Sequence, residues 1–384
     1  MENIAIITYH AAYNYGSVLQ AYATQFIVEK LGYGAEIINY RMQEQHYIYS
    51  LYRTKYGLKT FLKDLMQLPV HKERKSRQEK FEKFIASKMN LSKKCVTPED
   101  VYKSWESYKT IISGSDQIWN KHSLELENSS PKFMDPYLLK NFRGKKISYA
   151  SSIANMSDDE LNLIVPQINK FDFISMRESS SADRMRKLLH KEIPTVLDPT
   201  FLLDKAEWRQ IINLKVRATN EKYILYYSLA GLKPLKESAK ILKKIASMRN
   251  MKVKIITPFA YLKLDDEIIE MHPEVGPEDF LQLIYDAEMV VTNSYHGTIL
   301  SINLEKDVYS LCESGGSEFR KTDILEKLGM EERIIYTVED LEKHFTPIDY
   351  QRVHSKLEFL RSSSYKYLKT ALAEERKENS HENM

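Results

Sequence analysis

Glycine is scarce in this sequence, with 12 residues in 384, less than half of the usual share of about 7%. The chain also has 25 tyrosines and 43% hydrophobic residues, so it is neither collagen-like nor a low-complexity linker, nor a disordered protein. Where glycine does occur, we expect a conformational or packing reason for it. The length predicts two domains, each large enough to bury a core.

Other absences argue against several classes of protein. Cys95 and Cys312 are the only cysteines and form no CxxC motif, which argues against a disulfide scaffold, a zinc ribbon or an iron–sulfur site. The formal charge is only +3, which argues against a dedicated nucleic-acid-binding protein. No stretch approaches 18 consecutive apolar residues, and the chain begins with a strand-like run instead of a signal peptide. We therefore expect a reduced, cytoplasmic protein without a nucleic-acid partner.

Familiar cofactor and metal motifs are missing as well. The glycines at 32 and 34 precede an expected strand and lack a third glycine, so they form no dinucleotide fingerprint. The sequence contains no GxxxxGK[ST], HExxH or GxSxG motif. It also contains no DxD motif, which argues against metal-dependent sugar-nucleotide chemistry. We expect no metal and no bound cofactor.

Short apolar runs alternate with helical periodicity through most of the chain, which is typical of a layered α/β protein. The expected strands are 4–8, 35–40, 110–113, 147–150, 173–176 and 195–197, followed by 223–228, 252–256, 289–292 and 308–311. The expected helices are 17–31 (ended by Gly32), 158–170, 180–190, 235–249, 277–287 and 318–328. A polar bridge at 198–220 separates two such series, and a long helix with a charged tail follows from about 350. We place the domains at 1–198, 199–349 and 350–384.

Residues 41–94 interrupt this alternation with clustered aromatic residues and then a basic stretch. The aromatic residues are Tyr47, Tyr49, Tyr52, Tyr56 and Phe61, and the basic residues are Lys72, Arg74, Lys75, Arg77, Lys80 and Lys83. One interpretation is an inserted helical pair with an aromatic core face and a solvated basic face. The other is a patch, within about 46–94, that contacts a membrane surface or a lipid-linked substrate.

Four expected strands end in polar, aromatic or glycine-containing loops, at 9–17, 114–120, 177–181 and 293–298. In open α/β sheets the ligand crevice lies outside the carboxyl ends of the strands, where helix N-termini direct N–H groups at anions. Three of the scarce glycines fall in these loops: Gly16, Gly114 and Gly297. This coincidence predicts a site where the loops meet.

Each polar residue in these loops also has a structural interpretation. Asn14 and Ser17 would cap the following helix, and Ser180 with Asp183 would form a capping box. Asp116 would be a turn residue, Arg177 with Glu178 an internal ion pair, and His296 a histidine held by hydrogen bonds. Taken together, however, an arginine, a histidine and a carboxylate at strand ends form a reasonable acid/base site for an anionic ligand.

Six sequence segments occur in an order that resembles the polysaccharide pyruvyl transferase family, and the resemblance covers roughly residues 3–335. They are ITYHAAYNYGSVLQAYA, SGSDQIWN, SYASSIA, SMRESSSADRMRKLL, VLDPTFLL and VVTNSYHGTILSINL. The resemblance implies two Rossmann-like domains in a GT-B-like arrangement, with the final helix crossing back to the first domain. It also implies phosphoenolpyruvate as co-substrate and a pair of sugar hydroxyls as acceptor, which yield a cyclic pyruvate ketal and phosphate.

The same resemblance implies roles for three residues. Arg177 matches the arginine at the donor's phosphate or carboxylate, which it would clamp through bidentate bonds. His296 matches the donor-site histidine that would deliver or relay a proton, and Asp116 matches the acidic residue that would orient or deprotonate a hydroxyl. Many family members have Arg-Leu-His at 294–296, where this chain has Ser-Tyr-His, and Arg320 is the candidate replacement for the missing cation. Family members also often have Gly-Asp where this chain has Gly-Ser at 16–17.

The full set of expected site residues extends along the same loops. The expected donor-binding residues are Arg177, Asn293, Ser294, Tyr295, His296, Gly297, Thr298 and Arg320. The expected acceptor-binding residues are Tyr13, Asn14, Tyr15, Gly16, Ser17, Ser115, Asp116, Gln117, Asn120 and Ser151.

The favoured function is pyruvyl transfer in the assembly of a cell-surface glycan, such as a capsule or exopolysaccharide. The acceptor would be a soluble or a lipid-linked oligosaccharide, and the lipid-linked form is favoured. The enzyme would work in the cytoplasm, at the inner face of the membrane if the basic segment binds there. One alternative is a GT-B glycosyltransferase that uses a nucleotide sugar. Another is a relative that binds glycans without catalysis.

Overall fold

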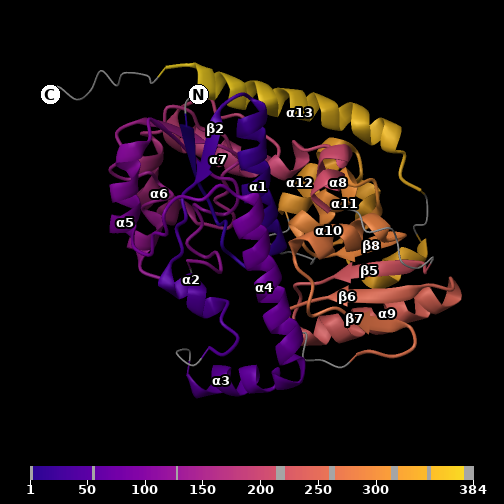
Figure 1. The fold of residues 1–384 in the computed structure, drawn as a ribbon. Coiled ribbons are helices and arrows are strands. Elements are labelled where there is room, and N and C mark those ends of the chain that lie inside the picture. The colour runs from indigo at the N-terminus through magenta and orange to yellow at the C-terminus, as the bar shows by residue number, and fades with distance from the viewer. Residues whose placement is uncertain are drawn as a thin grey trace.

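The structure, a computed structural model, describes residues 3–53, 57–126, 129–212, 221–258, 264–312, 319–343 and 347–375. It has two lobes, each built around a parallel sheet (Figure 1). The first sheet has the order β2-β1-β3-β4, with β1 (Asn3–Ile7), β2 (Gly34–Ile37), β3 (Thr110–Ser113) and β4 (Lys145–Ser148). The second has the order β10-β9-β8-β5-β6-β7. Its strands are β5 (Tyr223–Tyr227), β6 (Lys252–Ile256), β7 (Ile269–Met271), β8 (Met289–Thr292), β9 (Asp307–Leu311) and β10 (Ile334–Ile335).

Helices cover the two sheets, as parallel sheets require. The first lobe contains α1 (Tyr15–Lys30), α2 (Gln43–Ile48), α3 (Leu58–Leu65), α4 (His71–Lys88), α5 (Pro98–Ser104), α6 (Asp158–Ile168) and α7 (Ser179–Leu189). The second contains α8 (Lys205–Ile212), α9 (Leu232–Met248), α10 (Pro277–Asp286), α11 (Tyr295–Asn303) and α12 (Phe319–Leu328), and α13 (Tyr350–Ala373) follows. None of the described helices combines the length and apolar character needed to cross a bilayer.

The alternation of strands and helices predicted from the sequence is confirmed, with several differences in detail. Segments 173–176 and 195–197 form only isolated bridges, in which Met176 pairs with both Ser151 and Thr195. Strands β7 and β10 were not predicted, because three and two residues are too short to establish a period. The predicted capping box of α7 is wrong: its N-cap is Glu178 and makes no side-chain cap bond. The Glu178 carboxylate instead accepts bonds from Arg177 and Ser181.

Segment 41–94 forms three described α-helices and a short 3-10 helix at Leu68–Val70, instead of the expected helical pair. Helix α4 buries Phe81, Phe84 and Ile85 in the core. The aromatic residues expected to form the core face are only partly buried at the described positions Tyr47, Tyr49, Tyr52 and Phe61. Helix α3 differs, because its Leu58 is 72% exposed. In Figure 1, α3 lies at the end of the first lobe farthest from α13. Tyr56 and the tail from 376 lie outside the described residues.

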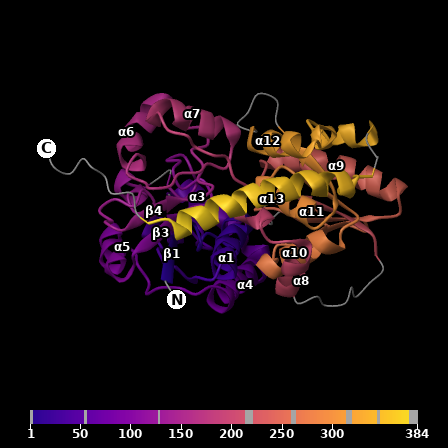
Figure 2. The same ribbon diagram turned by 90° about the horizontal axis from the view of Figure 1, so that it is seen from above.

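The final helix crosses from the second lobe back over the first, as expected (Figure 2). Tyr367 Oη donates to the Ser148 carbonyl at 2.8 Å, and the Leu197 amide donates to Ser364 Oγ at 2.9 Å. Lys145 Nζ donates to the carbonyl of Leu372 at 2.7 Å, near the C-terminal end of the helix. Helix α13 thus fastens the two lobes together.

The start of α1 packs directly against the second lobe. Asn14 fixes this start, because its Oδ1 accepts from the amides of Gly16 and Ser17, as the sequence predicted for Asn14. The Tyr15 ring stacks on Phe280 at a centroid distance of 4.3 Å, and its hydroxyl donates to the Val275 carbonyl at 2.8 Å. One hydrophobic core therefore contains residues of both lobes.

The strand orders determine where a ligand crevice forms. The order reverses between β1 and β3 in the first sheet and between β5 and β8 in the second. Such reversal points, at the carboxyl ends of parallel strands, are where α/β sheets bind ligands. Because α1 follows β1 and α11 follows β8, the packing of α1 on the second lobe brings the two points together.

Candidate functional site

A buried arginine is at the centre of the cluster where the lobes meet. Arg177 is 3% exposed. Its Nε lies 2.9 Å from Glu178 Oε1, while its Nη1 lies 3.1 Å from Asp198 Oδ2 and 3.7 Å from Asp116 Oδ1. Burial opposes its charge, but the neighbouring carboxylates and the Tyr295 hydroxyl raise the pKa of Arg177 well above its usual value. The guanidinium also lies over the Tyr295 ring at 4.5 Å.

Asp198 joins this arginine to the second lobe. Its Oδ1 accepts from the amide and hydroxyl of Thr200, at 3.0 and 2.7 Å. Its Oδ2 accepts from Ser115 Oγ at 3.2 Å and faces both Arg177 and His296. Burial alone would raise the pKa of Asp198, but His296, Arg177 and the bond from Thr200 hold it well below its ordinary value. Asp198 is therefore ionised at neutral pH.

His296 lies in the first turn of α11, whose N-cap Ser294 accepts from the amide of Gly297 at 3.3 Å. Its Nε2 lies 3.4 Å from Asp198 Oδ2, which is close enough for an ion pair. The two groups are not aligned for a hydrogen bond, and Nε2 has no hydrogen-bond partner among the described residues.

Each of the three loop glycines lies where a side chain would clash, and a Cβ on Gly297 would lie 2.6 Å from Thr292 Oγ1. The other two approach the cluster and its supporting loop. A Cβ on Gly16 would lie 2.0 Å from Nδ1 of His296, so only glycine lets the N-terminus of α1 approach this imidazole. A Cβ on Gly114 would lie 2.2 Å from the Tyr149 carbonyl, and the φ of Gly114 is +121°. Both close approaches shape the loops that surround Arg177.

Asp116 connects the first loop to the cluster. Its Oδ2 accepts from Ser17 Oγ at 2.8 Å and its Oδ1 from the Gln117 amide at 2.9 Å. Ser17 was predicted to cap α1, but its hydroxyl is used for this contact. The structure thus brings Ser17, Asp116, Arg177 and His296 together from four loops, as expected from the carboxyl ends of the strands.

Several other residues expected at the site are held by contacts within the protein. Tyr15 is 1% exposed and packs between the lobes, so its side chain is not free to contact a sugar. Ser115, Ser151 and Thr298 are fully buried. Asn120 Nδ2 donates to Gln117 Oε1, and Asn293 Oδ1 accepts from the Leu229 amide. Tyr13 points away from the cluster, because its hydroxyl donates to Glu82 at 2.7 Å.

Arg320 lies near the cluster at the start of α12 and is half-buried. Burial and the charge of Arg177 lower the pKa of Arg320, while Glu178 and Asp116 oppose this shift. The charges of Arg320 and Arg177 therefore repel each other. The glycines at 315 and 316 lie outside the described residues.

Three titratable groups of this region are not singled out as site residues by the sequence. Glu178 is expected there only as an ion-pair partner, and Asp198 lies within the segment VLDPTFLL without an expected role of its own. The position of Asp198 after the expected strand 195–197 was the signal that pointed to it. The third group, Glu125, is 6% exposed and accepts from the Tyr49 hydroxyl at 2.9 Å. Burial and the charge of Asp116 raise the pKa of Glu125 to about 7.

This arrangement combines a cation with groups that exchange protons. Arg177 Nη2 is buried and has no hydrogen-bond partner among the described residues, which leaves one charged donor of the cluster unsatisfied. The expected bidentate clamp differs from what the structure shows, because carboxylates already occupy Nε and Nη1. The N-terminus of α1 lies against His296 in the first turn of α11, so two helix N-termini meet at the cluster. Among the described residues, no group of three or more His, Cys, Asp or Glu is arranged to hold a metal ion.

We predict that Glu125→Gln changes the pH dependence of stability. Because the folded-state pKa of Glu125 is raised to about 7, its contribution to stability is present below pH ~4.5 and is lost as the pH rises to 7. The free energy of unfolding of the wild type should therefore fall by up to about 3 kcal/mol relative to the variant across that window.

Urea unfolding of both proteins over this pH range measures the difference. Glu237→Gln, at an exposed position of α9, is the matched control and should follow the wild type. Parallel curves for the wild type and Glu125→Gln would show that Glu125 does not titrate in this window.

Comparison with solved structures shows the fold. UDP-GlcNAc 2-epimerase from Neisseria meningitidis bound to UDP-GlcNAc is 8% identical with a TM-score of 0.51, over 98% of this chain and 95% of that one. The enzyme from Methanocaldococcus jannaschii is 11% identical with a TM-score of 0.51, over 98% and 94%. The enzyme from Rickettsia bellii is 11% identical with a TM-score of 0.50, over 96% and 98%. These similarities confirm an α/β fold with two parallel sheets in a GT-B-type arrangement.

Comparison of sequences identifies the family to which the chain belongs. None of the curated proteins matches the chain. The sequence model described as polysaccharide pyruvyl transferase matches residues 14–311, a span that includes the loops of Ser17, Asp116, Arg177 and His296. Because this match extends over most of the 384 residues, the chain belongs to the polysaccharide pyruvyl transferase family.

Proposed function

We propose that this member of the family transfers the enolpyruvyl group of phosphoenolpyruvate to two hydroxyls of a saccharide, forming a pyruvate ketal and releasing phosphate. The observation that supports this most directly is the buried pair of Asp198 and His296 beside the unpartnered Nη2 of Arg177. A donor with a phosphate and a carboxylate needs a cation, and its methylene carbon needs a proton. The cation and the proton-donating histidine lie together where the strand order of the two sheets reverses, between β1 and β3 and between β5 and β8.

The proposed reaction has simple requirements. A proton adds to the methylene carbon of phosphoenolpyruvate, and C2 becomes electrophilic. One sugar hydroxyl adds to C2 and gives its proton to a base. The bond from C2 to the phosphate oxygen then breaks, and the second hydroxyl adds in its place and loses its proton. In total, two C–O bonds and one C–H bond form, and one C–O bond, one C–C π bond and two O–H bonds are broken. One hydroxyl proton balances the proton added to the methylene carbon, and the other leaves with phosphate.

The cluster offers a residue for each requirement. His296, with Asp198 behind it at 3.4 Å, is the proposed proton donor. Asp116, whose carboxylate is oriented by Ser17, is the proposed base or orienting group for a hydroxyl. The Nη2 of Arg177, together with Arg320, is the proposed anion contact. Three carboxylates surround Arg177, so a second cation is needed to attract a donor with several negative charges.

Ligand binding distinguishes this donor from the nucleotide sugar of a GT-B glycosyltransferase. We expect phosphoenolpyruvate to raise the Tm of the protein, and UDP and UDP-GlcNAc to leave it unchanged. Protection by UDP-GlcNAc but not by phosphoenolpyruvate would favour the glycosyltransferase.

Catalysis by His296 is tested with lipid-linked glycans and phosphoenolpyruvate. We expect His296→Gln to slow phosphate release by about 100-fold or more, because general acid catalysis contributes this much. Mass spectrometry of the glycans should show the added pyruvyl ketal. His354→Gln, on the exposed side of α13, is the control and should react normally. Near-normal turnover by His296→Gln would remove this residue from the mechanism, and acceptor binding by the wild type without phosphate release would favour a non-catalytic protein.

The contact with Gly16 gives a second test of the donor site. We predict that Gly16→Ala displaces the His296 imidazole, because the new Cβ would lie 2.0 Å from Nδ1. Overpacking of this kind costs about 1–3 kcal/mol and should lower the Tm. Calorimetry should show phosphoenolpyruvate binding about tenfold weaker. Gly231→Ala is the matched control, because a Cβ there meets no atom within 4 Å. If Gly16→Ala binds phosphoenolpyruvate as tightly as the wild type, His296 does not contribute to donor binding.

We also propose that α3 rests on an anionic membrane surface, where a lipid-linked acceptor would be found. Its exposed face and the following turn present Leu58, Leu62, Met66 and Leu68, which are 72%, 52%, 61% and 54% exposed. Residues 57–94 contain eleven Lys or Arg and four Asp or Glu. Exposed apolar residues beside a basic segment suit the interface of anionic lipids.

Vesicle binding tests this membrane contact. The double variant Leu58→Ser with Leu62→Ser should bind vesicles of phosphatidylcholine and phosphatidylglycerol about tenfold or more weakly, because two leucines no longer enter the interface. Leu163→Ser is the control, since Leu163 is 79% exposed on α6. Equal binding by the double variant and the wild type would contradict the proposal.

A further inference from the structure

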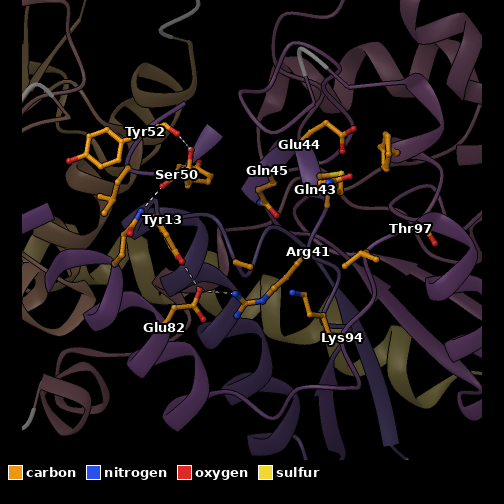
Figure 3. A pocket seen from close by; sticks show the side chains of 17 residues that line it. Tyr13, Arg41, Gln43, Glu44, Gln45, Ser50, Tyr52, Glu82, Lys94 and Thr97 are labelled. Carbon is orange, nitrogen blue, oxygen red and sulfur yellow. Dashed lines mark hydrogen bonds and ion pairs between the residues drawn. The ribbon is translucent and has the colours of Figure 1, made fainter. Parts of the chain in front are cut away.

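A cavity of about 890 Å³ lies in the first lobe, beside the inserted segment. It is formed by the loop before α1, the segment of α2 and the turn after it, one face of α4 and the chain at 94–97. Its lining residues are Ala11, Tyr13, Arg41, Met42, Gln43, Glu44, Gln45, Tyr49, Ser50, Leu51, Tyr52, Gln78, Glu82, Lys94, Val96, Thr97 and Phe133 (Figure 3).

The chemistry of this lining suits a neutral saccharide. Two cations, Arg41 and Lys94, are balanced by two carboxylates, Glu44 and Glu82, so the cavity has no excess charge to attract an anion. The remaining polar groups are amides and hydroxyls, which can each pair with sugar hydroxyls. Aromatic rings accompany them, and a ring with a polar edge packs well against the C–H face of a sugar.

Two lining residues have polar atoms that lack partners. The Nε2 of Gln45 and the Oε2 of Glu44 are buried and make no hydrogen bond within the described part of the chain. Gln45 is only 3% exposed, and in Figure 3 it lies between Tyr13 on one side and Glu44 on the other. A buried donor or acceptor without a partner costs free energy, which a ligand hydroxyl would recover. Gln45 thus offers one hydrogen-bond donor and Glu44 one acceptor.

One wall of the cavity is already rigid without a ligand. Glu82 Oε1 accepts from the Tyr13 hydroxyl and from Arg41 Nη1, each at 2.7 Å (Figure 3). Arg41 Nε also donates to Asn39 Oδ1 at 3.0 Å. Because these side chains are held in place, a bound ligand does not have to order them, which favours affinity.

The cavity also shares residues with the loops of the proposed active site. Tyr13 lies three residues before Gly16 on the loop between β1 and α1. Tyr49 donates to Glu125 at 2.9 Å, and the neighbouring Tyr9 hydroxyl contacts both Ser123 and the carbonyl of Gln117, next to Asp116. A chain of several sugars could therefore occupy the cavity while its end reaches Asp116.

We propose that this cavity binds a neutral oligosaccharide segment of the acceptor, and that Gln45 and Glu44 hydrogen-bond its hydroxyls. The inference rests on the proposed function. It adds a subsite that binds the acceptor through sugars distant from the reacting hydroxyls.

Saturation-transfer NMR with neutral trisaccharides tests the cavity directly. The probes are maltotriose, cellotriose, mannotriose, galactotriose and chitotriose, added to the full chain. We expect at least one to bind the wild type. Gln45→Leu and, separately, Glu44→Ala should weaken its binding at least tenfold, because each removes one hydrogen bond to the sugar. Gln210→Leu, at an exposed position of α8, is the matched control and should bind as the wild type does.

Protection by phosphoenolpyruvate separates this inference from the proposed function. Both cavity variants should keep that protection, which also shows that they fold. If phosphoenolpyruvate protects the wild type but no probe binds, or if both variants bind as tightly as the wild type, the cavity is not the acceptor subsite. If the probes bind as expected and phosphoenolpyruvate does not protect, the subsite stands and the proposed donor fails.

Discussion

The buried charge of Arg177 is the constraint on which the rest of the site depends. A guanidinium on a residue that is 3% exposed is tolerated only because Asp116, Glu178 and Asp198 surround it. These carboxylates come from different loops of the first lobe, while the aromatic ring under the guanidinium comes from α11 of the second. The ends of several strands are thereby held at one point. Removing one carboxylate would leave charge uncompensated and would also release a loop.

The same point is where the two lobes are held together. A shared hydrophobic core includes Tyr15 and Phe280, and α13 crosses both lobes (Figure 2). Gly16 completes this contact, because its missing side chain lets α1 lie against His296. The electrostatic cluster, the packing of α1 and the close approach at Gly16 are therefore parts of one arrangement. A shift of one lobe against the other would change the distance from His296 to Asp198.

The three α-helices of the inserted segment 41–94 have different roles. Helix α4 contributes buried aromatic residues to the core, and its lysines 80 and 88 pair with Asp279 and Glu278 of α10. Helix α2 lines the cavity, and α3 presents leucines to solvent. The aromatic and basic composition that the sequence shows in this segment thus arises from several environments. Part of the tyrosine surplus lies around the cavity, at Tyr13, Tyr49 and Tyr52.

The sequence by itself determined the alternation of strands and helices, the cap at Asn14 and the loops in which Gly16, Gly114 and Gly297 lie. These features depend on local periodicity and on the conformational preferences of single residues, both of which can be read along the chain. Only the tertiary structure decided that Asp198 lies between Arg177 and His296, that Ser17 binds Asp116 instead of capping α1, and that Tyr15 packs between the lobes. The short strands β7 and β10 also became visible only there. The reason is physical: a buried ion pair or a shared core is an interaction between residues far apart in sequence, and no local pattern specifies which of them meet.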